Sequence, residues 1–199
     1  MKPEKPMTAK SNYSGDAGRI EAAISDRTIA LVGLMGAGKS TVGKRLAEAL
    51  GRDFFDSDNE IERAAGLSIS DIFTLHGEAE FRRGERRVLE RLLSEAPHVL
   101  ATGGGAYLDP ETRQLLRERA ITIWLNADLE TLWRRVSRRS HRPLLKADNP
   151  KGVLSKLLTE RTPIYEQADL VVRSVEGPHK ATVDSILKAL DVWSKARHG

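Results

Sequence analysis

A glycine-rich segment has the residue types and spacing needed to bind phosphate groups. Residues 33–41 read G-L-M-G-A-G-K-S-T and match the pattern G-x-x-x-x-G-K-[ST]. Glycines let such a loop approach an anion closely, and its N–H groups bind the anion together with the following helix N-terminus. A flexible glycine turn is the alternative, but we predict a nucleoside triphosphate site. The predicted binding residues are Gly36, Ala37, Gly38, Lys39, Ser40 and Thr41, with Lys39 on the β- and γ-phosphates and Ser40 on Mg²⁺.

Missing motifs narrow the class of protein that this loop could serve. The chain has no Asn-Lys-x-Asp guanine reader, as a GTPase switch needs, and no L-S-G-G-Q segment, as an ABC-type ATPase needs. With 199 residues it is also shorter than most helicases. The sequence therefore favours a small kinase that phosphorylates a small molecule.

A pair of carboxylates provides candidates for the acceptor side of such a reaction. Asp56-Ser57-Asp58 follows the apolar pair Phe54-Phe55, which reads as a strand. Ligands bind beyond the carboxyl ends of parallel strands, and alternate side chains of an extended segment share a face. We expect Asp56 to face Mg²⁺ and its waters, and Asp58 to face an acceptor hydroxyl. An acidic turn or helix cap before a helix over residues 60–65 is the alternative.

Two further segments could contact an acceptor. Glu78 and Arg82 stand four residues apart in an arginine-rich helical stretch, in the order that favours an ion pair. Gly103-Gly104-Gly105 follows an apolar run and has no side chain to offer. Its backbone is therefore expected to approach a ligand or to supply N–H donors, with a simple loop as the alternative.

Alternating strand and helix patterns predict how these segments are positioned. Short apolar, β-rich runs lie at 28–32, 54–55, 99–102, 121–125 and 170–172, and helical patterns include 77–95, 128–137 and 152–167. This alternation predicts a three-layer α/β fold with a parallel sheet and right-handed crossovers. We predict one kinase domain over residues 26–199. Residues 1–25 have almost no apolar periodicity and are expected to be a disordered extension.

Composition sets limits on compartment and partners. The chain has no cysteine, and its longest segment without charge, 96–108, is shorter than a membrane span and interrupted by proline and glycines. We therefore expect a cytoplasmic protein. The net charge of +4 suggests nucleic acid, but residues 134–146 alone hold six basic residues and no acid. The remaining chain has 26 basic and 28 acidic residues, so the excess is local and suits small anionic substrates.

Six motifs, in this order and spacing, closely resemble those of the bacterial shikimate kinase family. They are G-L-M-G-A-G-K-S-T, F-x-D-S-D, I-F-x-x-x-G-E-x-x-F-R, G-G-G-A, R-P-L-L and E-R-x-x-x-Y, and they span roughly residues 29–190. The resemblance implies Mg²⁺-dependent transfer of the ATP γ-phosphate to the 3-hydroxyl of shikimate, on the pathway to chorismate and aromatic amino acids. It also implies the nucleoside monophosphate kinase fold, with sheet order 2-3-1-4-5. Within this fold, the resemblance places a shikimate-binding helical region at about 56–95 and a lid at about 138–150.

The resemblance assigns roles to particular residues. Asp56 matches a magnesium-side aspartate, acting through water, and Asp58 matches the candidate base that grips shikimate hydroxyls. Arg82 and Arg161 match two arginines that clamp the substrate carboxylate, which suits the bidentate guanidinium group. Gly103, Gly104 and Gly105 match the glycines whose backbone contacts the substrate.

The remaining roles concern the nucleotide. Lys39 keeps its phosphate role, and Arg142 matches the lid arginine that closes on the transferring phosphate. Arg135 and Pro178 match the pair that sandwiches adenine. Catalysis would then rest on Lys39, Asp58 and Arg142.

The expected partners are ATP and shikimate, bound by a monomer with neither nucleic acid nor a membrane. A gluconate or nucleoside monophosphate kinase of the same fold is the nearest rival, because it would share the phosphate loop. A non-catalytic nucleic-acid-binding protein is a rival from another class. It leaves the phosphate loop and Asp58 unexplained.

Overall fold

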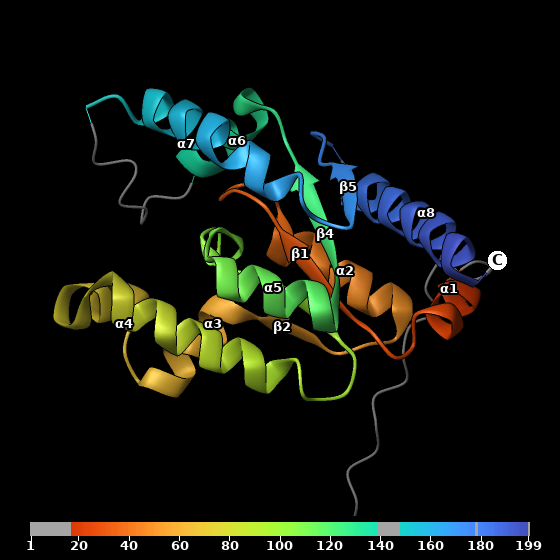
Figure 1. The fold of residues 1–199 in the computed structure, drawn as a ribbon. Helices are drawn as coiled ribbons and strands as arrows, with labels where there is room; N and C mark the ends of the chain where they lie inside the picture. Colours follow the sequence, from red (N-terminus) through yellow and green to blue (C-terminus); the bar gives the residue numbers. More distant parts are fainter. Residues whose placement is uncertain (1–16, 139–147, 178, 199) are drawn as a thin grey trace, which may run out of the picture.

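The computed structural model describes residues 17–138, 148–177 and 179–198, without the side chains of residues 197 and 198. Its centre is a five-stranded parallel sheet with the order β2-β3-β1-β4-β5, which confirms the predicted order (Figure 1). The strands are β1 (Thr28–Val32), β2 (Phe54–Asp56), β3 (Val99–Ala101), β4 (Ala120–Asn126) and β5 (Leu170–Arg173).

The central strand β1 is buried along its whole length, as expected of a strand with parallel neighbours on both edges and helices on both faces. It pairs with β3 on one edge, where Ile29 lies opposite Val99, and with β4 on the other, where Ile29 lies opposite Ile121. The carboxyl ends of β1 and β3 thus lie side by side. The segments that follow these two strands contain the glycine-rich loop and the glycine triplet.

Helices cover both faces of the sheet. They are α1 (Ala17–Ala23), α2 (Lys39–Leu50), α3 (Ser57–Ala65), α4 (Ile69–Leu92), α5 (Pro110–Arg119), α6 (Leu129–Ser137), α7 (Pro150–Tyr165) and α8 (His179–His198), with a short 3₁₀ turn η1 (Ala106–Leu108). α2 and α8 pack against each other and against the sheet, and α1 packs against both, whereas α5 packs against β4 and α4 (Figure 1). No helix in the described ranges is long and apolar enough to cross a membrane.

The expectation of a disordered extension is wrong for its last part. Residues 17–23 form α1, and Ile20 and Ile24 are fully buried in the core. The Arg52 guanidinium ties this helix down by bonding to the Glu21 carboxylate at 2.7 Å and to the Ile24 carbonyl at 2.8 Å. Two isoleucines four residues apart are too short a pattern to reveal a helix that is stabilised by distant partners. Residues 1–16 lie outside the described residues.

The structure adds a helical segment before the helix predicted to begin at residue 77, so that α4 as a whole begins at Ile69. Ser68 caps it by accepting a hydrogen bond from the Asp71 N–H at 3.1 Å. Gly77 interrupts the helix with a φ of 77°, a left-handed conformation that favours glycine. The glycine therefore separates two helical segments of α4, and the second segment begins directly after it, close to the predicted start.

Candidate active site

An open pocket of about 630 Å³ lies at the carboxyl edge of the sheet. Its walls come from the glycine-rich loop, the end of β2 and start of α3, the segment after β3, α6 and the loop before α8. The described residues that line it are Met35, Gly36, Gly38, Lys39, Ser40, Thr41, Asp56, Asp58, Thr102, Gly104, Thr131, Arg134, Arg135, Arg138, Glu176, Gly177 and His179. The glycine-rich loop and both candidate aspartates thus share one cavity.

The glycine-rich loop has the conformation that phosphate binding requires. Gly36 and Gly38 have φ angles of 85° and 98°, and α2 begins directly after them at Lys39. The Lys39 ammonium group donates to the carbonyls of Gly33 at 2.7 Å and Leu34 at 3.2 Å. This places a charged amine inside the loop, next to the helix N-terminus that would hold an anion.

Side chains behind the loop bind its carbonyl groups. The buried Ser174 hydroxyl donates to the Ala37 carbonyl at 2.8 Å. Arg135 on α6 donates to Ser174 Oγ at 3.0 Å and to the Gly36 carbonyl at 3.3 Å. Burial lowers the pKa of this guanidinium. These hydrogen bonds to the carbonyls fix the conformation of the loop.

Ser40 and Asp56 form the part of the site that suits a divalent cation. The Ser40 hydroxyl donates to Asp56 Oδ2 at 2.6 Å, which brings two hard oxygen ligands together at the pocket wall. Mg²⁺ is bound by one or two protein oxygens, with water and phosphate completing its shell. Among the described residues, no group of three or more His, Cys, Asp or Glu side chains could hold a metal ion, and Mg²⁺ with a nucleotide needs none. The residues present therefore fit this ion.

Asp58 lines the same pocket, although the local geometry differs from the expectation. Asp56 ends β2 and caps α3, and its Oδ1 accepts the Asp58 N–H at 3.1 Å. Asp58 thus lies in the first turn of a helix and not on an extended segment, because the cap starts the helix at Ser57. Both the capping interpretation and the pocket placement hold for this acidic pair.

A buried ion pair lies beside Asp58. Arg82 on α4 donates to Glu85 at 2.6 Å and to Glu78 at 3.2 Å, and the Glu85 side chain is only 1% exposed. Burial raises the pKa of Glu85, and the Asp58 charge raises it further, whereas Arg82 opposes the shift. The Arg82 guanidinium also packs on Gly105, where an added Cβ would lie 2.5 Å from Nη2.

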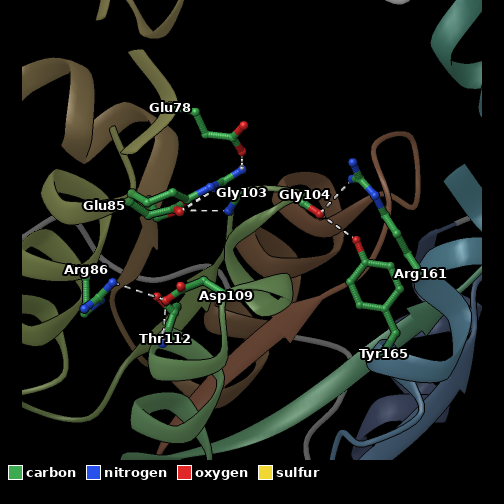
Figure 2. Close-up of polar contacts among 11 residues, drawn as sticks. Glu78, Glu85, Arg86, Gly103, Gly104, Asp109, Thr112, Arg161 and Tyr165 are labelled. Carbon is green, nitrogen blue, oxygen red and sulfur yellow. Dashed lines mark hydrogen bonds and ion pairs between the residues drawn. The ribbon is translucent and has the colours of Figure 1, made fainter. Parts of the chain in front are cut away.

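The glycine triplet contacts both Arg82 and Arg161. On its other side, α7 brings Arg161 Nη1 to 3.5 Å from the Gly104 carbonyl and the Tyr165 hydroxyl to 2.5 Å from the same oxygen (Figure 2). The Gly103 N–H donates to Ser57 Oγ at 2.9 Å, so this amide is bonded within the protein. An added Cβ on Gly103 would lie 2.6 Å from Asp58 Oδ1. Gly103 therefore serves close packing, and Gly104 and Gly105 remain as candidate substrate contacts.

Most of the predicted site residues meet around this pocket and the triplet. Arg142 and Pro178 lie outside the described residues, as does the centre of the predicted lid. Sequence reasoning missed Glu85 and Ser174 and assigned no role to Tyr165. Glu85 follows Arg82 by one helical turn, and that spacing is the only local signal for their pairing.

A phosphate loop opening into a pocket that also holds a carboxylate is the arrangement of P-loop phosphotransferases, and this fold and site put the chain in that class. A family model described as shikimate kinase matches residues 35–191. The chain belongs to the shikimate kinase family.

Individual relatives agree with this assignment. A shikimate kinase of Rhodopseudomonas palustris is 50% identical over 94% of this chain and 92% of its own length. One of Caulobacter vibrioides is 54% identical over 85% and 84%. Among solved structures, shikimate kinase from Acinetobacter baumannii in complex with shikimate has a TM-score of 0.81 at 41% identity, covering 87% of this chain and 97% of that chain. A gluconokinase from Sinorhizobium meliloti, at 22% identity, covers 87% and 97% with a TM-score of 0.56 and shares the fold alone.

Proposed function

We propose that this chain transfers the γ-phosphate of ATP to the 3-hydroxyl of shikimate, giving shikimate 3-phosphate and ADP. The observation that carries the proposal is the convergence at one sheet edge of the phosphate loop, Asp58 and two arginines around a glycine triplet. Guanidinium groups suit a carboxylated acceptor, and the solved relative from Acinetobacter baumannii binds shikimate.

The nucleotide side of the reaction uses the loop and its neighbours. Lys39 would exchange its carbonyl partners for the phosphate oxygens of ATP, and the loop N–H groups would hold the same anion. Ser40 and Asp56 would hold Mg²⁺, Asp56 through water, and this ion supplies charge neutralisation on the phosphates. Arg135 and Pro178 would flank adenine, and Arg142 would close on the transferring phosphate, as the sequence resemblance implies.

The acceptor side positions the hydroxyl and its ring. Arg82 and Arg161 would bind the shikimate carboxylate, with Gly104 and Gly105 contacting a ring hydroxyl. Asp58 would orient the 3-hydroxyl for in-line attack and accept its proton as the phosphoryl group transfers. Catalysis would come from positioning and charge stabilisation, since phosphoryl transfer needs little covalent chemistry from the protein.

We expect the proposed reaction to take place in the cytoplasm. Because one chain carries every group named above, we also expect the enzyme to act as a monomer. A kinase of the same fold that acts on gluconate or a nucleoside monophosphate is the alternative. Two guanidinium groups around the glycine triplet suit a carboxylate better than a nucleobase, and the choice between shikimate and gluconate is left to the measurement below.

Substrate selectivity tests the proposal. ADP release from Mg·ATP is measured with shikimate, quinate, gluconate and AMP as acceptors. We expect selective turnover with shikimate. Turnover with another member of this panel alone would contradict the proposal.

The Asp58→Asn variant tests the role of the acceptor carboxylate. It should lower kcat by about 10²–10⁴-fold, the usual contribution of a positioned acid or base, while ATP affinity stays near the wild-type value. Asp71→Asn is a matched control, because Asp71 also lies in the first turn of a helix but is exposed and outside the pocket. Near-normal turnover in Asp58→Asn would overturn the assignment.

A further inference from the structure

Tyr165, the last residue of the E-R-x-x-x-Y motif, has no role in the reaction described above. It lies at the end of α7, is fully buried, and its ring stacks on Trp124 with centroids 6.0 Å apart. Its hydroxyl donates to the Gly104 carbonyl at 2.5 Å (Figure 2). A tyrosine hydroxyl is protonated at neutral pH, and burial raises the pKa of this one further.

This hydrogen bond sets the direction of one peptide group of the glycine triplet. The peptide between Gly104 and Gly105 is trans, so its C=O and N–H point in opposite directions. With the Gly104 carbonyl bonded to α7, the Gly105 N–H must point away from α7, whereas Arg82 packs on Gly105 from the α4 side. A peptide group between two glycines rotates easily, because neither residue has a side chain. A hydrogen bond from outside the triplet is therefore needed to fix its orientation.

The same oxygen also faces Arg161, one turn earlier on α7. Arg161 Nη1 lies 3.5 Å from the Gly104 carbonyl, a longer contact than that of the tyrosine hydroxyl. The Gly104 carbonyl is partly buried, and a donor within the protein stabilises it. Without the hydroxyl, Arg161 would be the remaining side-chain donor to this carbonyl among the described residues, and it would be drawn away from a bound carboxylate.

We infer that Tyr165 is a positioning residue for the acceptor: through the Gly104 carbonyl it aims the Gly105 N–H and leaves Arg161 to the substrate carboxylate. The inference rests on the proposed function. It predicts that the hydroxyl affects acceptor binding and leaves nucleotide binding unchanged.

Tyr165→Phe removes the hydroxyl and keeps the stacked ring. We expect KM for shikimate to rise roughly tenfold, the equivalent of one hydrogen bond, with KM for ATP unchanged. Tyr107→Phe is the matched control: Tyr107 is also fully buried, but among the described residues its hydroxyl makes no hydrogen bond to the glycine triplet. That variant should keep both KM values. A shikimate KM equal to wild type in Tyr165→Phe would overturn the inference.

Two further measurements separate positioning from general support of the fold. Dissociation constants for shikimate and for analogues lacking one ring hydroxyl are compared between wild type and Tyr165→Phe, in the presence of ADP. Positioning predicts that deleting one particular ligand hydroxyl costs less affinity in the variant than in wild type. Equal losses for all analogues would overturn the inference.

Replacing Tyr165 with 4-aminophenylalanine returns a donor to the same place and should restore KM for shikimate. Failure of this rescue in a variant with wild-type thermal unfolding would count against the hydroxyl's role.

Different results would contradict the proposed function and this inference. A wild-type enzyme inactive on shikimate contradicts the proposed function, whereas an active wild type with a normal Tyr165→Phe variant contradicts this inference alone.

Discussion

Charge is buried on the acceptor side of the pocket, where the Glu85 carboxylate is almost fully enclosed against Arg82. Removing both members of such a pair can cost little stability, whereas removing one leaves a buried charge without its partner. The pair also fixes the guanidinium that packs on Gly105. Stability and acceptor binding therefore depend on the same residues here.

At this scale we predict that Arg82→Met destabilises the fold by about 3 kcal/mol, because Glu85 loses its partner. The double variant Arg82→Met/Glu85→Gln should recover much of this loss, although both should bind shikimate weakly. Urea unfolding measures the difference. Arg83→Met is the control, since Arg83 pairs with Glu80 at the surface and should contribute less than about 1 kcal/mol. Equal destabilisation of the single and double variants would contradict the argument.

Among the elements, the loop between β5 and α8 supports the phosphate loop from behind. Ser174 lies directly after β5, and its hydroxyl bridges Arg135 on α6 to the Ala37 carbonyl. Three segments far apart in sequence thus hold one loop conformation. The preorganised N–H groups depend on this support.

We therefore expect Ser174→Ala to raise KM for ATP about fivefold, as expected when a buried carbonyl loses one of its donors. KM for shikimate should stay unchanged, because the glycine triplet is held separately by α7. Initial-rate kinetics with each substrate varied in turn measures both values. Ser194→Ala is the control: Ser194 is also buried, but it bonds to the Asp191 carbonyl within α8. A parallel rise in both KM values for Ser174→Ala would argue for general loosening instead.

At the scale of the whole molecule, the excess positive charge of the chain is concentrated at the pocket. Arg134, Arg135 and Arg138 begin the basic run noted in the sequence, and all three line the pocket. Burial lowers the pKa of His179 on the same wall, and Arg45 and Arg135 lower it further. The charge that suggested nucleic acid therefore borders the phosphate loop.

The core role of the N-terminal region gives a prediction at this scale. Ile24→Ala should destabilise the protein by about 2–5 kcal/mol, the cost of truncating a fully buried isoleucine, with both KM values unchanged. Val192→Ala is the control, since Val192 is 67% exposed on α8 and should change stability by less than about 0.5 kcal/mol. Thermal and urea unfolding measure the two effects. A negligible loss in Ile24→Ala would contradict the packing of α1.

The sequence by itself determined the features whose signal is local. The phosphate loop is one unbroken segment, the strands are short apolar runs, and the sheet order followed from motifs that resemble a known family. Ser40 and Asp56 were both predicted to face Mg²⁺, and the structure joins their side chains by a hydrogen bond.

The tertiary structure alone decided the contacts that join distant segments. Ser174 meets the Ala37 carbonyl across 137 residues, and Tyr165 meets the Gly104 carbonyl across 61. No local sequence pattern identifies the hydrogen-bond acceptor of either residue, because a hydroxyl bonds to whichever carbonyl the fold brings near. The same reason hid α1, because Ile20 and Glu21 in the helix, and Ile24 directly after it, are held by contacts with the distant α2, α8 and Arg52. Local motifs carry the chemistry of this protein, and long-range packing decides how that chemistry is held.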